Sequence, residues 1–523
     1  MANATIIEDA RDADDDTGET KRGREETVPS HPADAQGKPA APGRQGKPRQ
    51  HDKVTRMGTA PIGRLMLEFS IPAVAAVVLN SLYNVIDSIF LGQAMGEIGL
   101  AATQVAFPIM TIVNAFAILA GNGGNSLAAI LLGEGRKDDA ERALGNSVTV
   151  MIIVSIAAAI YATFWIDPLL VLVGATDVTL PYARTFIQII IYGMMICNIS
   201  FGVNNFIRTA GAPNLALWTT VVGTVVCVIL NYLFVLVFGW GVAGSASATI
   251  IGQAVTAVIV LWYFVSSRSS APFKLHARNL AIDPKICKRL IELGLAPFGL
   301  QAAMAVTQVI SNMLLASLGA ADPIGVDGAL ASIGVVSKIT GVVFFPALGI
   351  AIAAQPILGF NTGARKYRRV LRTLYVALGA ATAILTVFFV LIHVFPEQII
   401  SVFGIEASLM SFAVWALIVQ TALIPLISVQ VISSNYFQAT GQPLKSAFLS
   451  LTRQLIFLLP AFLITPTLIP SLFPGMTPLM GYCFSFPIAD GLSVLLSALL
   501  LVIEVRKQHR RIAEAEAKGA VTK

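Results

Sequence analysis

Long apolar segments constrain the fold of this chain more than any other feature of its sequence. A helix needs about 20 apolar residues to cross the hydrocarbon core of a bilayer, and the chain offers twelve such segments. They lie near residues 64–91, 98–132, 143–165, 182–207, 214–237, 243–265, 289–318, 328–359, 370–394, 410–437, 444–466 and 479–504. Every backbone amide in hydrocarbon must be hydrogen-bonded within its own segment. The sequence therefore predicts an all-α integral membrane protein with twelve transmembrane helices.

The placement of charged residues gives the orientation of these helices. Only 13% of the 523 residues are charged, too few to cover a water-exposed surface of this size. Lys and Arg occur in alternate connecting segments, as in Arg136, Lys274 and Arg369, and the segments between them carry acids such as Asp167 and Glu397. By the positive-inside rule, the basic segments and both termini are cytoplasmic. We expect a multi-pass protein of a bacterial cytoplasmic (inner) membrane, surrounded by lipid and without a nucleic-acid partner.

The first 57 residues differ in composition from the rest of the chain. They are rich in charged residues, Pro, Gly and Gln, and cannot bury enough apolar surface to fold alone. This predicts a solvated tail, although its later, basic part could contact anionic lipids. The predicted domains are a disordered cytoplasmic tail over 1–57, an N-terminal lobe over 58–265, a cytoplasmic linker loop over 266–288, a C-terminal lobe over 289–505 and a cytoplasmic tail over 506–523.

The two halves of the chain repeat one pattern. An Arg-Leu pair ahead of Pro72 recurs ahead of Pro297, 225 residues later, and the segment Asn205–Pro213 recurs as Asn435–Pro443. Equivalent helices then enter the membrane from the same side. We therefore expect two six-helix bundles related by a pseudo-two-fold axis along the membrane normal.

Short motifs occur in a fixed order between about residues 60 and 505. They are Pro72 with Leu82–Gly92, Leu132–Gly135, Arg208–Pro213, Gly239–Ala246, Gln355–Ala364, Arg453–Gln454 with Pro460, and Pro487–Asp490. Together they resemble the multidrug and toxic compound extrusion (MATE) family, and those of the second half are similar to its MepA-like bacterial branch. The resemblance implies two lobes in a V shape and export of drugs coupled to inward H⁺ or Na⁺ movement. We expect a monomer that is not an enzyme and needs no cofactor besides the coupling ion.

An acidic residue within the first span is the main candidate for function. A carboxylate at the centre of a membrane helix costs about 2.5–3.5 kcal/mol or more, so Asp87 needs a reason to be there. Helical spacing puts Asn80, Asn84 and Asp87 on one face, with Tyr83 beside it. Low dielectric disfavours the ionised carboxylate, so Asp87 could take up a proton near neutral pH; it could also merely cap the outer end of its helix. Members of the resembling family use an Asp at this motif position for cation coupling.

The internal repeat shows a position at which the two halves differ in charge. Asn312 stands 225 residues after Asp87, and Gln301 and Gln308 complete a polar face on the seventh helix. The ion site is therefore expected in the first lobe, while the second half lines the substrate path. The predicted ion-coupling residues are Asp87, Asn84, Asn80, Asn198 and Asn231, and the predicted substrate-binding residues are Tyr83, Gln188, Tyr192, Gln301, Gln308, Asn312 and Lys338. Each supporting residue could instead make a hydrogen bond that only aids helix packing.

The chain departs from some relatives in ways that bear on the ion. The fifth helix has Cys227 and Asn231 where some family members have an Asn and an Asp, and the seventh helix lacks a Glu found in Na⁺-coupled members. These departures favour H⁺ over Na⁺, with Na⁺ at Asp87 as the remaining metal alternative. Lys338 lies deep in the eighth span, where it could be a counter-charge, snorkel, or pair with a helix-end carbonyl. Asp490 could be its partner or could face the inner cavity, and Arg453 is expected to anchor its helix at the inner interface.

Three functions can be compared. The first is ion-coupled export of amphipathic cations, for which a sparse apolar cavity with one acid is suited. The second is a flippase or exporter of a lipid-linked saccharide or other metabolite, which would favour a more cationic cavity than Lys338 alone provides. The third, a channel or membrane enzyme, is disfavoured because the spans hold no metal cluster, nucleophile triad or filter-like loop.

Overall fold

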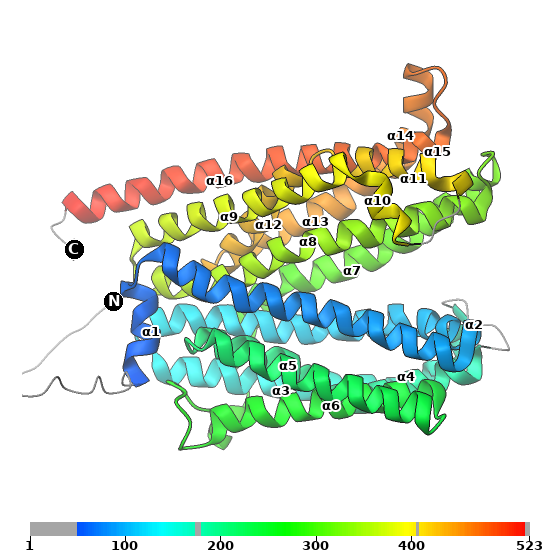
Figure 1. Ribbon diagram of the computed structural model, residues 1–523. Helices are drawn as coiled ribbons and strands as arrows, with labels where there is room; N and C mark the ends of the chain where they lie inside the picture. The colour runs from blue at the N-terminus through cyan, green and yellow to red at the C-terminus, as the bar shows by residue number, and fades with distance from the viewer. Residues whose placement is uncertain (1–49, 173–178, 404–406, 518–523) are drawn as a thin grey trace, which may run out of the picture. The chain divides into compact units, whose positions relative to one another are not determined.

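The computed structural model describes residues 50–172, 179–403 and 407–517, and all regular elements in these ranges are helical (Figure 1). The helices of the first half are α1 (Gln50–Thr59), α2 (Ile62–Gly133), α3 (Lys137–Leu172), α4 (Leu180–Thr209), α5 (Pro213–Asn231), η1 (Tyr232–Val237) and α6 (Gly241–Val265), followed by the short η2 (Ala277–Leu280). Those of the second half are α7 (Pro284–Ala320), α8 (Gly325–Gly363), α9 (Tyr367–Val394), α10 (Pro396–Ser401), α11 (Ala407–Gln420), α12 (Ile424–Ala439), α13 (Pro443–Leu451), η3 (Thr452–Leu458), α14 (Leu459–Leu472), α15 (Pro478–Cys483) and α16 (Ser485–Ala517).

The number of membrane spans agrees with the sequence. Among the described residues, eleven helices are long and apolar enough to cross a bilayer, and the pair α11 and α12 makes a twelfth span if it is counted as one. That pair is bent by 47° at the short break after Gln420, where the sequence predicted a continuous helix. The prediction of an all-α membrane protein with twelve spans is confirmed.

Helix α2 holds the first two spans. It contains 72 residues, and a straight helix of that length would measure about 108 Å, far more than the hydrocarbon core of a bilayer. The chain therefore reverses direction within α2, and Figure 1 shows this turn at the end opposite α1. The two apolar windows are Ile62–Leu79 and Ile109–Gly133. The segment 92–97, predicted as a loop, keeps helical hydrogen bonding instead.

One end of the helix bundle gathers the basic connections. Helix α1, the C-terminal end of α16 and the connections α2–α3, α6–α7 and α8–α9 lie there (Figure 1); we call it the basic end. Helix α7 begins at Pro284, inside the predicted linker, because Asp283 caps it by accepting from the amides of Lys285 (2.9 Å) and Ile286 (3.4 Å). Helix α16 extends to Ala517, so much of the predicted C-terminal tail is helical.

The last residues of the predicted N-terminal tail are also helical. Met57 of α1 is 1% exposed and packs in the hydrophobic core of the second half. Arg369 donates to the carbonyls of Met57 (3.0 Å) and Ala60 (2.6 Å), and Lys366 donates to the carbonyl of Gly58 (2.9 Å). These donors satisfy carbonyls that the end of α1 leaves unpaired. The expectation of disorder through residue 57 is thus corrected for residues 50–57, and residues 1–49 lie outside the described part.

The two halves meet at the basic end through glycines on α2, α7 and α8. A Cβ atom added to Gly123 would lie 2.2 Å from the Leu290 carbonyl oxygen, and one added to Gly294 would lie 2.0 Å from that of Leu119. A second pair repeats this contact: a Cβ on Gly133 would lie 2.0 Å from the Phe360 carbonyl oxygen, and one on Gly363 would lie 2.0 Å from that of Ile130. Only glycine permits so close an approach of two backbones.

Each half also contains a π-helical segment in its fifth span. η1 follows α5, and η3 separates α13 from α14. Such segments are rare and occur often at functional sites. Asn231 precedes η1 and Arg453 lies within η3, and both residues bind a carboxylate, as described next.

Candidate functional site

The candidate ion site is built around Asp87 from three helices of the first half. Asp87 lies on α2 and is half-buried. Its Oδ1 accepts a hydrogen bond from Ser245 Oγ of α6 at 2.6 Å and another from Nδ2 of Asn231, the last residue of α5. Asn231 is 1% exposed and Ser245 is fully buried. The structure thus brings Asn231 to Asp87, as the ion-site hypothesis requires.

The local chain geometry explains why α5 and α6 both reach Asp87. After η1 the chain turns sharply at Gly239 (φ 69°) and Gly241 (φ 54°), a conformation that favours glycine. This turn reverses the chain and puts Ser245 in the first turns of α6, beside the end of α5. Phe234 and Trp240 stack across the turn with ring centroids 4.8 Å apart. Ser245 is not among the residues predicted for the ion site, although it lies in the Gly239–Ala246 motif.

The partners described for Asp87 are neutral, whereas two other buried acids have cationic partners. Asp490 of α16 accepts from Nε of Arg453 in η3 at 2.6 Å, and Glu504 of α16 accepts from Nζ of Lys445 at 3.0 Å. Asp490 and Glu504 are 2% and 1% exposed. Asn231 also keeps a buried Oδ1 without a hydrogen-bond partner in the described structure. Within the described residues, the Asp87 site therefore combines a carboxylate without a cationic partner and an amide oxygen without a donor.

The Arg453–Asp490 pair corrects one expectation. Asp490 was considered as a partner for Lys338, but it binds Arg453, because η3 packs against α16. Arg453 is half-buried, and its expected place at the inner interface stays a prediction. Lys338 on α8 is exposed, and no salt bridge is found for it among the described residues.

No described contact joins the remaining predicted residues of the first half to Asp87. The side chains of Asn80, Tyr83 and Asn84 lie outside the described residues. Asn198 is buried and donates to Ser155 Oγ of α3 at 2.9 Å, so its described partner is not Asp87. Gln188 is half-buried, while Tyr192 is exposed and shares a hydrogen bond with Thr163 at 3.2 Å.

The predicted polar face on α7 is partly seen. Gln308 Nε2 donates to Asn312 Oδ1 at 2.9 Å, both side chains are exposed, and Gln301 is half-buried. A further polar link, which the sequence did not indicate, joins the two halves. Gln355 of α8 donates to Ser126 Oγ (2.7 Å) and accepts from Asn125 Nδ2 (3.3 Å), both on α2.

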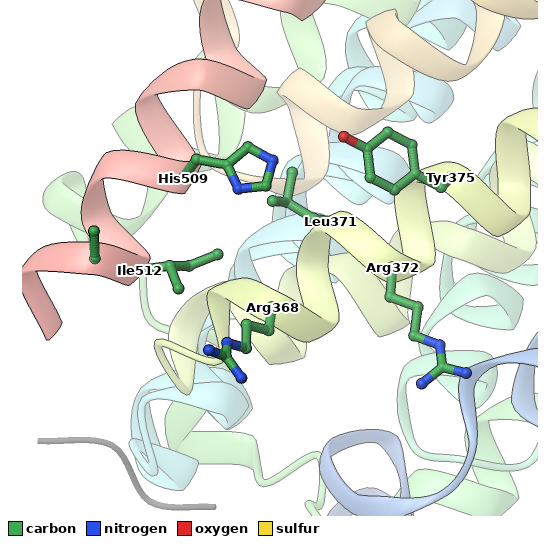
Figure 2. Close-up of a pocket in the computed structure, with 7 residues that line it drawn as sticks. Arg368, Leu371, Arg372, Tyr375, His509 and Ile512 are labelled. Atoms are coloured by element: carbon green, nitrogen blue, oxygen red, sulfur yellow. The ribbon is translucent and has the colours of Figure 1, made fainter. Parts of the chain in front are cut away.

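The described residues offer neither a metal site nor a cavity at Asp87. No group of three His, Cys, Asp or Glu side chains in the described part could hold a metal ion. Two cavities lie at the basic end: one of about 390 Å³ is lined by Asp138, Arg142, Arg278 and Asn279, and one of about 540 Å³ lies between α9 and α16 (Figure 2). Neither of these cavities is lined by Asp87.

Comparison with known proteins identifies the family of this chain. The MatE family model matches residues 72–233 and 298–463, one match in each half and together more than half of the chain. The chain belongs to the MatE family. Because the model matches once in each half, it confirms the two homologous bundles expected from the repeat.

Several relatives share most of this MatE chain. "Multidrug export protein MepA" of Staphylococcus saprophyticus is 22% identical over 458 residues, covering 86% of this chain and 95% of the relative. "Probable multidrug resistance protein YoeA" of Bacillus subtilis is 25% identical over 368 residues, covering 68% and 77%. A solved structure of the MATE multidrug transporter DinF-BH is 34% identical, with a TM-score of 0.77 over 85% of this chain and 96% of that one.

Proposed function

We propose that this protein is a secondary active exporter of amphipathic, cationic, drug-like compounds, driven by inward H⁺ movement. The observation that carries the proposal is the contrast between Asp87, held by neutral donors, and Asp490 and Glu504, each paired with a cation. A carboxylate without a cationic partner can exchange a proton for a positive substrate charge, whereas a paired one is already compensated. Relatives named for multidrug export and for multidrug resistance support drug-like substrates.

Proton uptake would change the hydrogen bonds that join three helices. Ionised Asp87 only accepts, so Asn231 and Ser245 both donate to it. Protonated Asp87 carries a donor, and the buried Oδ1 of Asn231 is a suitable acceptor once the amide rotates. Protonation would then re-order contacts among α2, α5 and α6 and displace a cationic substrate. This is a local change in hydrogen bonding that biases a two-state equilibrium.

The conformation fits alternating access. We infer that the basic end is cytoplasmic, by the positive-inside rule. The close glycine contacts of α2 with α7 and α8 and the link from Gln355 to Ser126 would close the path at that end. The state described would therefore be closed to the cytoplasm, and the inward-open state would require those contacts to separate.

Efflux from proteoliposomes tests the proposal. The full chain is reconstituted in vesicles loaded with a fluorescent amphipathic cation, and efflux is followed under an imposed pH gradient and, separately, an imposed Na⁺ gradient. Efflux driven by the pH gradient is expected. Efflux driven only by Na⁺ would replace H⁺ by Na⁺ as the coupling ion, and efflux driven by neither gradient would contradict ion-coupled export.

A further inference from the structure

A buried arginine at the basic end is not used by the proposed proton site. Arg208 lies in the last turn of α4 and is 6% exposed. Its Nη1 donates a hydrogen bond to Oδ1 of Asn205 at 2.5 Å. Its Nε is buried without a hydrogen-bond partner, and no salt bridge is found for its guanidinium within the described ranges. In this part of the chain, the positive charge of Arg208 therefore has only a neutral partner.

The usual reasons for an arginine at the end of a membrane helix do not account for Arg208. An arginine that anchors a helix at the membrane surface keeps its charged group in water, whereas this side chain is buried. A cation in the last turn can also bond the free carbonyls of its own helix. The described bond of Arg208 goes to a side-chain amide instead. Because burying an unpaired charge is costly, the charge of Arg208 needs a functional reason.

Arg208 faces a stretch of α2 near the basic end. Asn205, Arg208 and Thr209 are spaced by three and four residues and share a helical face. Asn205 Nδ2 donates to Asn122 Oδ1 at 3.0 Å, and Thr209 Oγ1 donates to Asn125 Oδ1 at 2.6 Å. Both neighbours of Arg208 on this face therefore reach the second apolar window of α2.

The same stretch of α2 makes the contact between the two halves. Asn125 Nδ2 donates to Gln355 Oε1 of α8 at 3.3 Å, and these two residues are 2% and 3% exposed. A Cβ atom added to Gly123 would lie 2.2 Å from the Leu290 carbonyl oxygen of α7. Arg208 therefore adds a positive charge directly behind the closed contact between the halves.

The charge is confined to one half of the internal repeat. The segment Asn205–Pro213 recurs as Asn435–Pro443, so Gln438 of α12 corresponds to Arg208. Gln438 is also buried, and its Nε2 donates to the Leu293 carbonyl oxygen of α7 at 3.0 Å. A neutral side chain thus satisfies the packing of this position in the second half, whereas the half with the candidate ion site has a cation.

We infer that Arg208 is an electrostatic barrier that keeps cations, protons included, from crossing the closed contact at the basic end. The inference rests on the proposed function, because coupling to an ion gradient requires that the ion does not cross without substrate. An arginine beside a narrow path repels cations and protons by its charge. A unit charge about 10 Å from a crossing ion, at an effective dielectric of about 20, lowers the population of that ion on the order of tenfold. Anions are not repelled.

Passive ion flux through the full chain tests the barrier. The protein is reconstituted in vesicles without substrate, with valinomycin and K⁺ to balance charge, and the influx of H⁺ and of Cl⁻ is followed with fluorescent indicators. Arg208→Gln, which introduces the side chain type of Gln438, is expected to raise H⁺ influx about tenfold without raising Cl⁻ influx. The charge-conserving Arg208→Lys should stay close to the native protein. The control Arg278→Gln removes the same charge from an exposed position of η2 and should change neither flux.

The pattern of fluxes separates a charge barrier from tight packing. Increased influx of both H⁺ and Cl⁻ in Arg208→Gln would mean a loosened contact and would overturn the inference. Native H⁺ influx in Arg208→Gln would overturn it too, and so would an Arg208→Lys variant that leaks as fast as Arg208→Gln. An equal rise in Arg278→Gln would trace the effect to surface charge and also contradict the barrier.

Thermal unfolding in detergent shows whether Arg208→Gln folds. Because the substitution removes a buried charge without a charged partner, its melting temperature should not fall; a marked fall would show a stabilising partner for Arg208 and overturn the inference. No substrate is present in the flux assay. Efflux driven by neither gradient would therefore contradict the export proposal while leaving these fluxes as they are, so the two failures are distinguishable.

Discussion

The glycine contact between the two halves gives the sharpest prediction about conformation. Replacing Gly294 with Ala would put a methyl group about 2.0 Å from the Leu119 carbonyl oxygen. That oxygen belongs to backbone within α2, so it cannot rotate away as a flexible side chain would. The two helices must separate, and overpacking of this kind costs about 1–3 kcal/mol. Alanine also favours the helix by up to about 1 kcal/mol, but α7 is expected to stay helical in both states, so this gain cancels.

The clash exists only where the halves are in contact at the basic end. Gly294→Ala is therefore expected to shift the equilibrium toward the state open at that end by about 5-fold to 150-fold. The measurement is the distance distribution between spin labels at positions 136 and 365, on the α2–α3 and α8–α9 connections, by pulsed electron paramagnetic resonance. The fraction of molecules with a longer distance between the two labels should increase.

The matched control is Gly379→Ala on α9, where an added Cβ would meet nothing within 4 Å. It should leave the distances unchanged. If Gly294→Ala leaves them unchanged as well, or if both variants shift them equally, the reasoning about this contact is refuted.

Two further predictions concern stability. Asp490→Asn leaves the half-buried Arg453 without its charge partner. The free energy of unfolding should fall by about 3 kcal/mol, the lower end of the range for a buried pair. Thermal unfolding in detergent measures the loss, and the double variant Asp490→Asn with Arg453→Gln should recover part of it. An unchanged melting temperature for Asp490→Asn would contradict the pairing. Arg369→Gln removes donors to the Met57 and Ala60 carbonyls, so amide hydrogen exchange in α1 should accelerate. Arg372→Gln is the control. Equal exchange rates in the native protein and both variants would refute the docking of α1.

Features with a fixed length or period could be predicted from the sequence. Twelve apolar segments of membrane length gave the helix count, and the recurrence of Pro72 at Pro297 gave the two bundles. Local hydrogen bonding is harder to predict. The bend after Gln420 and the π-helical segments depend on how neighbouring helices pack, and their residues do not differ visibly from ordinary span residues.

The sequence predicted part of the Asp87 site. Asp87 stood out because an acid is costly in a span, and Asn231 because it is polar at similar depth. Ser245 did not stand out, since a serine between Gly244 and Ala246 is also typical of close helix packing. Asp490 binds Arg453 rather than Lys338 because of how each helix is oriented about its own axis. Residue spacing along a single helix does not reveal that orientation.

The most direct test of the coupling role of Asp87 is proton release on substrate binding. The detergent-solubilised full chain in weak buffer, with a pH indicator, is mixed with an amphipathic cation, and the released protons are counted. The proposal predicts proton release by the native protein and its loss in Asp87→Asn. The control is Asp167→Asn, which removes an exposed carboxylate paired with Arg184 at 2.6 Å and should release protons normally. Undiminished release from Asp87→Asn would contradict the central claim.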